Sequence, residues 1–433
     1  MKNNIIKRLI ITCLALTVAL SGTTVNANIV LSKKETTKYI NTIAHRQMST
    51  VKNPTHSSAG GEWTVMGLAR AGKITNDYKK TYKKNLKKTL DSCGGELSKR
   101  TYTDYSRTVI ALTSIGENPY NFYGYDVISP LAEMDNVTKQ GLNGVAYALI
   151  ALNCGDYNVG PQSGYDGRVG SREIYKELIV SAALPKGGWS LFSKKADVDM
   201  TAIAVQSLAP YYNKDAEVKK AINDGLKVLS ERQKSNGGFE SMGNENCESC
   251  SQVLTTISTL GISVKDKRFI KNGNTVLDGL MKYYDNGAFK HTEKNLVNQM
   301  ATDQAFYALV AYRNTLANDP PLFNMKKVAV KKSKRKPASK KTNKKTNNKA
   351  NNIVNNDNQI NNSVETTKKN KKKNKKNEKI TTTNPSTTVN IVKETTVNKK
   401  KEGTSRFALW WIGLILAAAA SVTIAFFVFK KRS

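Results

Sequence analysis

The chain has 433 residues and a formal net charge of +34, with 68 Lys and Arg against 34 Asp and Glu. Residues 326–404 hold 24 Lys and Arg against 5 Asp and Glu, a net charge of +19. Residues 1–27 add +3 and residues 405–433 add +4, so only +8 remains for residues 28–325. The basic runs also lack interleaved aromatic residues, so the charge does not indicate a nucleic-acid-binding domain, and we expect no nucleic acid partner.

The first 27 residues have the pattern of a secretory signal peptide. A positive start, Met1–Arg8, precedes an apolar run from Leu9 to Leu20, and Val25–Ala27 supplies the small residues of a cleavage site. The apolar run is too short to cross a bilayer comfortably. We therefore expect an exported chain and not a first transmembrane helix.

Residues 28–325 are numerous enough to bury a large core, and their apolar residues recur with helical spacing. Six pairs of segments predict an all-α fold, an α6/α6 toroid of outer and inner helices, with an open solenoid as the alternative. The predicted outer helices are Lys-rich and amphipathic: 35–47, 76–92, 120–134, 171–184, 214–233 and 267–284. The predicted inner helices are rich in Ala, Ser, Thr and Gly: 61–72, 104–116, 140–153, 197–211, 248–261 and 298–314.

A Gly-rich bend with an aromatic residue precedes four of the inner helices. The bends are Gly60-Gly61-Glu62-Trp63, Gly187-Gly188-Trp189, Gly237-Gly238-Phe239 and Gly287-Ala288-Phe289. In a closed ring all inner helices run in the same direction, so their N-termini, with free N–H groups and partial positive charge, meet at one mouth. We expect ligand-binding residues there: Trp63, Tyr105, Asn143, Trp189, Asp199, Glu248, Gln252, Gln299 and Asp303.

The bends and the segment Asp197–Ala202 resemble the prenyltransferase and squalene-oxidase repeat proteins, which have the terpenoid-cyclase α/α-toroid fold. The resemblance covers about residues 35–315. It is closer to a group of exported Firmicute surface proteins with this toroid, in which similar segments recur. These segments are Thr103–Arg107, Lys139–Gly144, Ala209–Tyr212 and Asn298–Thr302. The resemblance specifies a fold more than an activity.

The resemblance also suggests one chemistry. In the cyclases an Asp-x-Asp-Asp motif protonates an alkene, and here Asp197 and Asp199 match its first and middle positions while Met200 stands at the last. A terpene-cyclase-like enzyme with Asp199 as general acid is therefore the alternative function, and whether the domain is an enzyme stays open. The other interpretation is that Asp197 or Asp199 caps the inner helix.

Ligand binding is the preferred function, because a cyclase cavity needs more aromatic residues than the inner helices offer: Tyr105, Tyr147 and Tyr307. The expected ligand is a small hydrophobic or corrinoid-like molecule, a glycan or a protein. A glycan-cleaving toroid would need two carboxylates across the cavity, for which Asp199 with Glu248 or Asp303 could serve. No cofactor is predicted.

Four cysteines follow the signal: Cys93, Cys154, Cys247 and Cys250. An even number in an exported chain permits disulfides, and sequence alone does not select the pairing. Cys247 and Cys250 could form a local disulfide or remain two thiols whose position at a helix start favours the thiolate. A zinc site completed by His291 would lack a fourth ligand, so no metal is predicted.

The C-terminal part predicts a tether. Residues 326–404 are mostly Lys, Asn and Thr and should be a disordered linker, reaching roughly 260 Å when fully extended. Its cations could bind anionic cell-wall polymers. Residues 405–433 are expected to anchor the protein, with 407–429 spanning the membrane and Lys430–Arg432 on the cytoplasmic side. We therefore expect a single-pass cell-membrane protein with an extracellular N-terminal domain.

Overall fold

The computed structural model describes residues 29–328, and these residues are mostly helical, as expected for an all-α protein. They enclose one large hydrophobic core and belong to one compact unit, so residues 28–328 are expected to fold without the rest of the chain. None of the helices in this part of the chain is long and apolar enough to cross a membrane. The predicted signal and anchor, and all but the first three residues of the predicted linker, lie outside the described residues.

All six predicted inner helices are present. Most residues of these helices are buried; in α9, the extreme case, only Asp199 among residues 198–208 is not. Small side chains allow this, because they let helices pack on all sides. The inner helices are α3 (Trp63–Ala71), α5 (Thr103–Ser114), α7 (Gly141–Cys154), α9 (Val198–Leu208), α11 (Cys247–Thr259) and α13 (Gln299–Ala317).

Four of the six predicted outer helices are confirmed. They are amphipathic, and in α4 the residues Tyr78, Tyr82, Leu86 and Leu90 form one buried stripe at a spacing of four. Ser32, Thr75, Ser171 and Asp215 cap the four helices with their side chains. The confirmed outer helices are α2 (Lys33–Thr50), α4 (Asn76–Ser92), α8 (Arg172–Ser181) and α10 (Ala216–Arg232).

The other two predicted outer helices, 120–134 and 267–284, are wrong for most of their length. In the first, Tyr123 and Gly124 have positive φ and form a turn, and only the 3-10 turn η2 (Ser129–Ala132) and α6 (Met134–Val137) follow. In the second, Asn272 and Gly273 also have positive φ, and helical structure is limited to η5 (Lys267–Phe269) and α12 (Val276–Met281). Tight turns of this kind interrupt a helix.

Two short antiparallel hairpins were not predicted. β1 (Glu240–Ser241) pairs with β2 (Asn244–Glu245), and β3 (Tyr284–Asp285) pairs with β4 (Ala288–Phe289). Both hairpins turn through two residues with positive φ. The remaining short helical elements are η1 (Ser58–Glu62), η3 (Thr138–Gln140) and η4 (Ala209–Tyr211).

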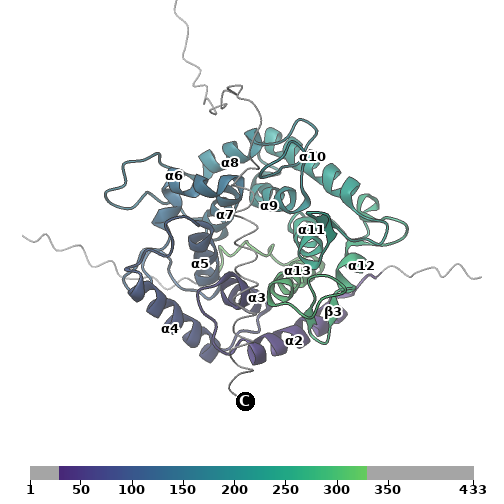
Figure 1. The fold of residues 1–433 in the computed structure, drawn as a ribbon, viewed down its shortest axis with the longest axis horizontal. Coiled ribbons are helices and arrows are strands. Elements are labelled where there is room, and N and C mark those ends of the chain that lie inside the picture. The colour runs from purple at the N-terminus through teal and green to yellow at the C-terminus, as the bar shows by residue number, and fades with distance from the viewer. Residues whose placement is uncertain (1–28, 329–433) are drawn as a thin grey trace, which may run out of the picture. The chain divides into compact units, whose positions relative to one another are not determined.

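Each inner helix packs against the next one along the chain, and the last, α13, also packs against the first, α3. Figure 1 shows the inner helices grouped around the centre of the domain, with the outer elements on the periphery. A buried carboxylate accounts for part of the contact between the two ends of the domain. Asp303 of α13 accepts hydrogen bonds from Gly60 N, Thr64 Oγ1 and Gln47 Nε2, all in the first repeat.

Candidate functional site

Three inner helices begin with the same capping arrangement. The N-cap residue donates its backbone N–H to the carbonyl oxygen of the aromatic residue in the preceding bend, and its side chain accepts from the N–H of the third helical residue. The caps and their acceptor distances are Asp197 (2.7 Å to Met200 N), Asn246 (2.8 Å to Ser249 N) and Asn298 (3.0 Å to Ala301 N). Asp197 is therefore the N-cap of α9, which is the second of the two interpretations given for it above. Its position as the first acid of a catalytic motif has no further support.

Asp199 lies two residues after its cap, in the first turn of α9, and has no such structural partner. Its Oδ1 atom is buried and makes no hydrogen bond within residues 29–328, and the same holds for the neighbouring Ser249 Oγ. Burial raises the pKa of Asp199, while weak side-chain hydrogen bonds from Ser249 and Ser241, which fall outside good hydrogen-bond geometry, offset part of that rise. Buried polar atoms normally have partners. These two atoms are thus the strongest indication of a binding site.

Glu248 occupies the equivalent position of the next inner helix, α11. Its Oε2 lies 2.8 Å from His291 Nδ1, and the exposed fractions of the two side chains are 15% and 46%. Burial raises the pKa of Glu248, His291 opposes this rise, and the carboxylate of Asp199 adds to it. The structure therefore brings Asp199 and Glu248 within electrostatic reach of each other. His291 is also attached to α11 through its carbonyl oxygen, which accepts from Cys247 N at 2.9 Å.

Asp303, which was predicted to bind ligand, is instead fully hydrogen-bonded. Besides its three donors in the first repeat, it accepts from Gln299 Nε2 at 3.1 Å, and its residue is 1% exposed. Burial outweighs these donors and raises the pKa of Asp303 to about 6. Gln299 also donates to Gln47 Oε1 at 2.6 Å. Both predicted site residues therefore connect α13 to the start of the domain, through the Asp303 carboxylate and the Gln299 side-chain amide nitrogen.

Aromatic rings from three inner helices meet near the centre. The ring of Trp63 lies 5.8 Å from the ring of Tyr147 and 5.8 Å from that of Tyr307. Gln252 Nε2 donates to the Tyr307 hydroxyl and to Gln304 Oε1, both at 2.8 Å. Trp63 and Gln252 thus belong to a packed, hydrogen-bonded layer in which the rings contact each other.

The structure also corrects the assignment of two predicted ligand-binding residues. Trp189 is completely buried and its Nε1 donates to Ile179 O at 2.7 Å, so it belongs to the core between an inner and an outer helix. Tyr105 is 3% exposed and packs against Tyr102, with ring centroids 5.1 Å apart. Asn143 remains half-buried in the first turn of α7.

The four described cysteines are free thiols, so Cys247 and Cys250 do not form the disulfide that was one of the two alternatives. Their side chains contact different neighbours: Cys247 Sγ lies 3.8 Å from Ala301 O, and Cys250 Sγ lies 3.5 Å from Gly279 O. Burial raises the pKa of both thiols, that of Cys250 to about 12. The expected stabilisation of the thiolate is therefore wrong, because desolvation outweighs the helix N-terminus.

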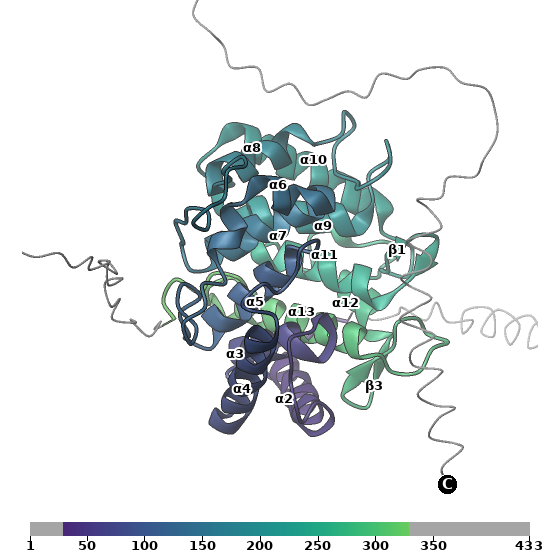
Figure 2. The same ribbon diagram turned by 60° about the vertical axis from the view of Figure 1, so that its left-hand side comes forward.

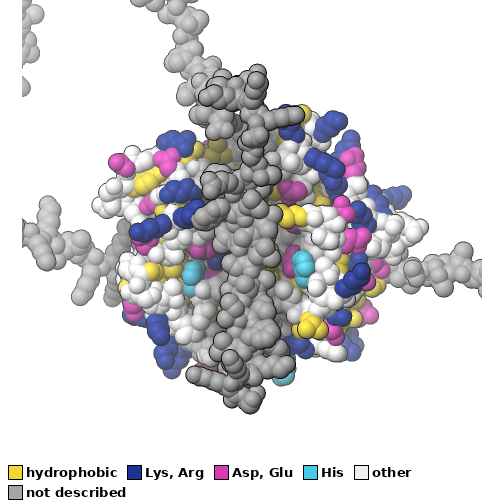
Figure 3. All heavy atoms as spheres, in the orientation of Figure 1, with side chains coloured by type: hydrophobic (Ala, Val, Ile, Leu, Met, Phe, Trp, Pro, Cys, Tyr) yellow, Lys and Arg dark blue, Asp and Glu magenta, His cyan; other side chains and the backbone are white. Residues whose placement is uncertain are grey.

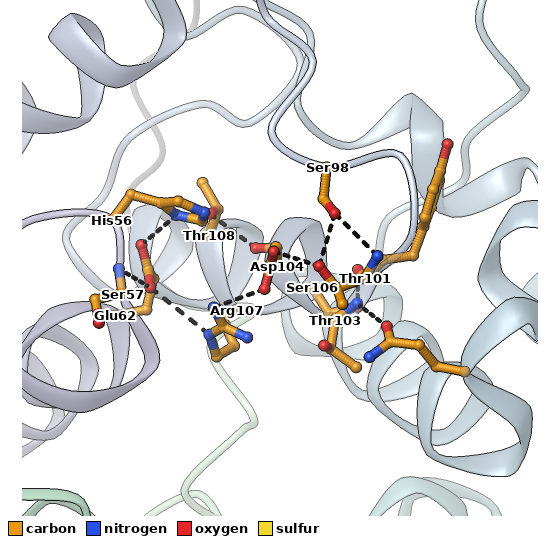
Figure 4. Close-up of polar contacts among 12 residues, drawn as sticks. His56, Ser57, Glu62, Ser98, Thr101, Thr103, Asp104, Ser106, Arg107 and Thr108 are labelled. Carbon is orange, nitrogen blue, oxygen red and sulfur yellow. Dashed lines mark hydrogen bonds and ion pairs between the residues drawn. The ribbon is translucent and has the colours of Figure 1, made fainter. Parts of the chain in front are cut away.

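A second polar cluster, which the sequence interpretation missed, lies between α3 and α5 (Figure 4). Glu62 is completely buried; its carboxylate accepts from Ser57 N and the Tyr82 hydroxyl, and lies 2.9 Å from His56 Nδ1. Arg107 bridges Glu62 and Asp104, at 3.7 Å and 2.8 Å. Burial lowers the pKa of His56, but the hydrogen bond and charge of Glu62 outweigh this and raise it.

This cluster had a signal in the sequence, because Asp104 and Arg107 stand three residues apart in an otherwise small and apolar helix. Its carboxylates are paired within the cluster, unlike Asp199. Within the described part of the chain, no group of three or more His, Cys, Asp and Glu side chains is arranged to hold a metal ion.

Comparisons with known proteins add no assignment: no protein-family model matches the chain, and no curated protein matches it. The site is therefore interpreted from its own residues.

Proposed function

We propose that the chain is an exported, single-pass membrane protein whose helical domain is an α/α toroid that binds a hydroxyl-rich ligand, a glycan, at the mouth formed by the N-termini of α9 and α11. The toroid is supported by the packing of α13 against α3, which an open solenoid would lack. Export and anchoring are supported by the signal-like residues 1–27 and the apolar run 407–429.

The observation that carries the binding site is the buried Oδ1 of Asp199, which has no hydrogen-bond partner among the described residues. Ser249 Oγ, also without a partner there, and the Glu248–His291 pair lie at the same mouth. These are acceptors and short hydroxyl groups, which suit the donors of a sugar better than an apolar ligand. The central aromatic rings pack against each other, which favours a ligand at the mouth over one in the centre.

Calorimetric titration with a panel of neutral, amino and acidic oligosaccharides tests this function. We expect residues 28–328 to bind at least one of them, and Asp199→Asn to weaken binding about tenfold or more, since a hydrogen bond to a charged group contributes about 1.5–3 kcal/mol. Asp224→Asn is the matched control, because Asp224 pairs only with Lys220 on the exposed face of α10. Absence of binding to every oligosaccharide, or equal affinity of Asp199→Asn and wild type, contradicts the proposal.

A second candidate function is general-acid catalysis by Asp199, as in a terpene-cyclase-like enzyme. The direction of the pKa shift of Asp199, upward through burial, favours it, because a general acid needs a higher pKa than an exposed carboxyl has. Met200 at the last motif position weighs against it, because a methionine does not supply the third carboxyl of the motif. Met200 is instead buried, and its backbone N–H donates to the Asp197 cap. Conversion of an isoprenoid substrate by wild type and its loss in Asp199→Asn would favour the enzyme over the binding protein.

A further inference from the structure

Three consecutive loops at the mouth expose large apolar side chains. Each loop lies between an aromatic bend and the inner helix that follows it: the segment before α9, the β1–β2 turn before α11, and the segment before α13. The most exposed large apolar residue of each is Phe192 (80%), Met242 (90%) and Leu296 (88%). Leu191, Val297 and Met300 are also exposed beside them. Single exposed apolar residues are ordinary, but a repeated set at one structural position marks an interaction surface.

The three loops are neighbours in space as well as in structural position. β1 packs against α9, and Ser241 lies close enough to Asp199 to affect its pKa. The loop before α13 reaches the start of α11, where His291 O accepts from Cys247 N. In Figure 2 the hairpins of β1 and β3 extend from the same side of the domain. We call this set, with its apolar residues Phe192, Met242 and Leu296, the apolar rim.

Lysines flank the apolar rim. Lys194 and Lys195 follow Phe192, and Lys294 precedes Leu296; all three are exposed, and their ammonium groups have no ion-pair partner within residues 29–328. Three glutamates of the same loops are instead paired with lysines nearby: Glu240 with Lys234, and Glu245 and Glu293 both with Lys282. On the face shown in Figure 3, hydrophobic and Lys or Arg side chains both appear around the edge of the domain.

From this placement we propose that the apolar rim docks the domain on an anionic lipid bilayer, with Phe192, Met242 and Leu296 in the interfacial layer and the three lysines at the headgroups. Apolar side chains flanked by unpaired cations fit such a surface, because burial of the former and attraction of the latter act together. The expected anchor at 407–429 would keep the domain close to a membrane and raise the effective lipid concentration. The proposal does not depend on the identity of the glycan.

Sedimentation with vesicles tests the docking. Residues 28–328 are mixed with vesicles of equimolar phosphatidylglycerol and phosphatidylcholine, or of phosphatidylcholine alone. We expect binding to the anionic vesicles that weakens with salt. The triple variant Phe192→Ser, Met242→Ser, Leu296→Ser should bind at least tenfold less, because it removes the three apolar side chains that the interfacial layer would bury. Tyr123→Ser with Val169→Ser, two exposed apolar residues of other loops, is the matched control and should bind as wild type.

The lysines are tested in the same way. The triple variant Lys194→Gln, Lys195→Gln, Lys294→Gln should lower binding to anionic vesicles at least tenfold, because it removes three cations that the anionic headgroups attract. Lys80→Gln, Lys84→Gln, Lys88→Gln on α4 removes the same charge from exposed positions elsewhere and should change binding much less. Absence of wild-type binding to anionic vesicles, or equal losses in the rim variants and their controls, overturns the proposal. Unchanged thermal unfolding verifies that the variants are folded.

Discussion

α9 and α13 each hold, near their N-termini, a carboxyl whose pKa is raised by desolvation, Asp199 and Asp303, yet the two differ in their hydrogen bonds. Asp303 in α13 accepts from four donors, three of them from the first repeat. Asp199 in α9 has an oxygen without any partner in the described residues. A raised pKa alone therefore does not distinguish a structural carboxyl from a functional one, whereas the set of hydrogen-bond partners does.

The difference predicts that substitution of the two carboxyls changes stability by very different amounts. Asp303→Ala should lower the free energy of unfolding by about 4 kcal/mol at about pH 5, because it leaves several buried donors without an acceptor. Asp199→Ala should change it by less than about 1 kcal/mol, because it removes only weak contacts with the Ser249 and Ser241 hydroxyls and breaks no well-formed hydrogen bond at Oδ1. Urea unfolding followed by circular dichroism measures both. Equal losses in the two variants would show that the comparison is wrong.

The pH dependence of stability sharpens the same comparison. The pKa of Asp303 rises from 3.8 to about 6 on folding, so the folded protein binds more protons than the unfolded chain in this window. The free energy of unfolding should therefore fall as pH rises from about 4 to about 6, by about 3 kcal/mol from this group.

Asp303→Asn is the control for this effect, because the amide cannot ionise. Unfolding of wild type and variant is measured across the same pH range, and the difference between them isolates the group. A constant difference between the two proteins would contradict the raised pKa of Asp303.

The smallest expected effect concerns Asp197, which stands next to Asp199 but is a helix cap. Asp197→Ala should cost about 1 kcal/mol of unfolding free energy, while Asp197→Asn should stay within about 0.5 kcal/mol of wild type, because Asn caps helices as well as Asp. The chain itself uses Asn at the equivalent positions Asn246 and Asn298. Glycan affinity of Asp197→Asn should match wild type; a loss as large as that of Asp199→Asn would place Asp197 in the site.

The helical periodicity and the small-residue composition were sufficient to predict the inner helices, because burial on all sides restricts which residues those helices can contain. The outer helices at 120–134 and 267–284 could not be predicted in this way. There the positive φ of Tyr123 and Asn272 was not recognised, although Gly follows each of them in the sequence. Turn chemistry overrode a weak amphipathic pattern.

The site was predicted less well than the fold. Asp199 and Glu248 share a position after their caps, and the repeated bends predicted that the two lie close together, which the effect of Asp199 on the pKa of Glu248 supports. Trp189 and Asp303 also lie at or near repeated bends, yet neither is free for a ligand. Trp189 is part of the hydrophobic core, and Asp303 joins the two ends of the domain. Such roles depend on contacts between residues far apart in the sequence, for example Asp303 with Thr64, and one sequence does not reveal them.

Native mass spectrometry of the helical domain, released from the membrane of the cell that makes it, tests the site at Asp199 most directly. The account predicts that wild type and Asp224→Asn carry a small molecule with the mass of a glycan, and that Asp199→Asn carries none. The same bound mass in Asp199→Asn, or an unliganded wild type, would contradict it.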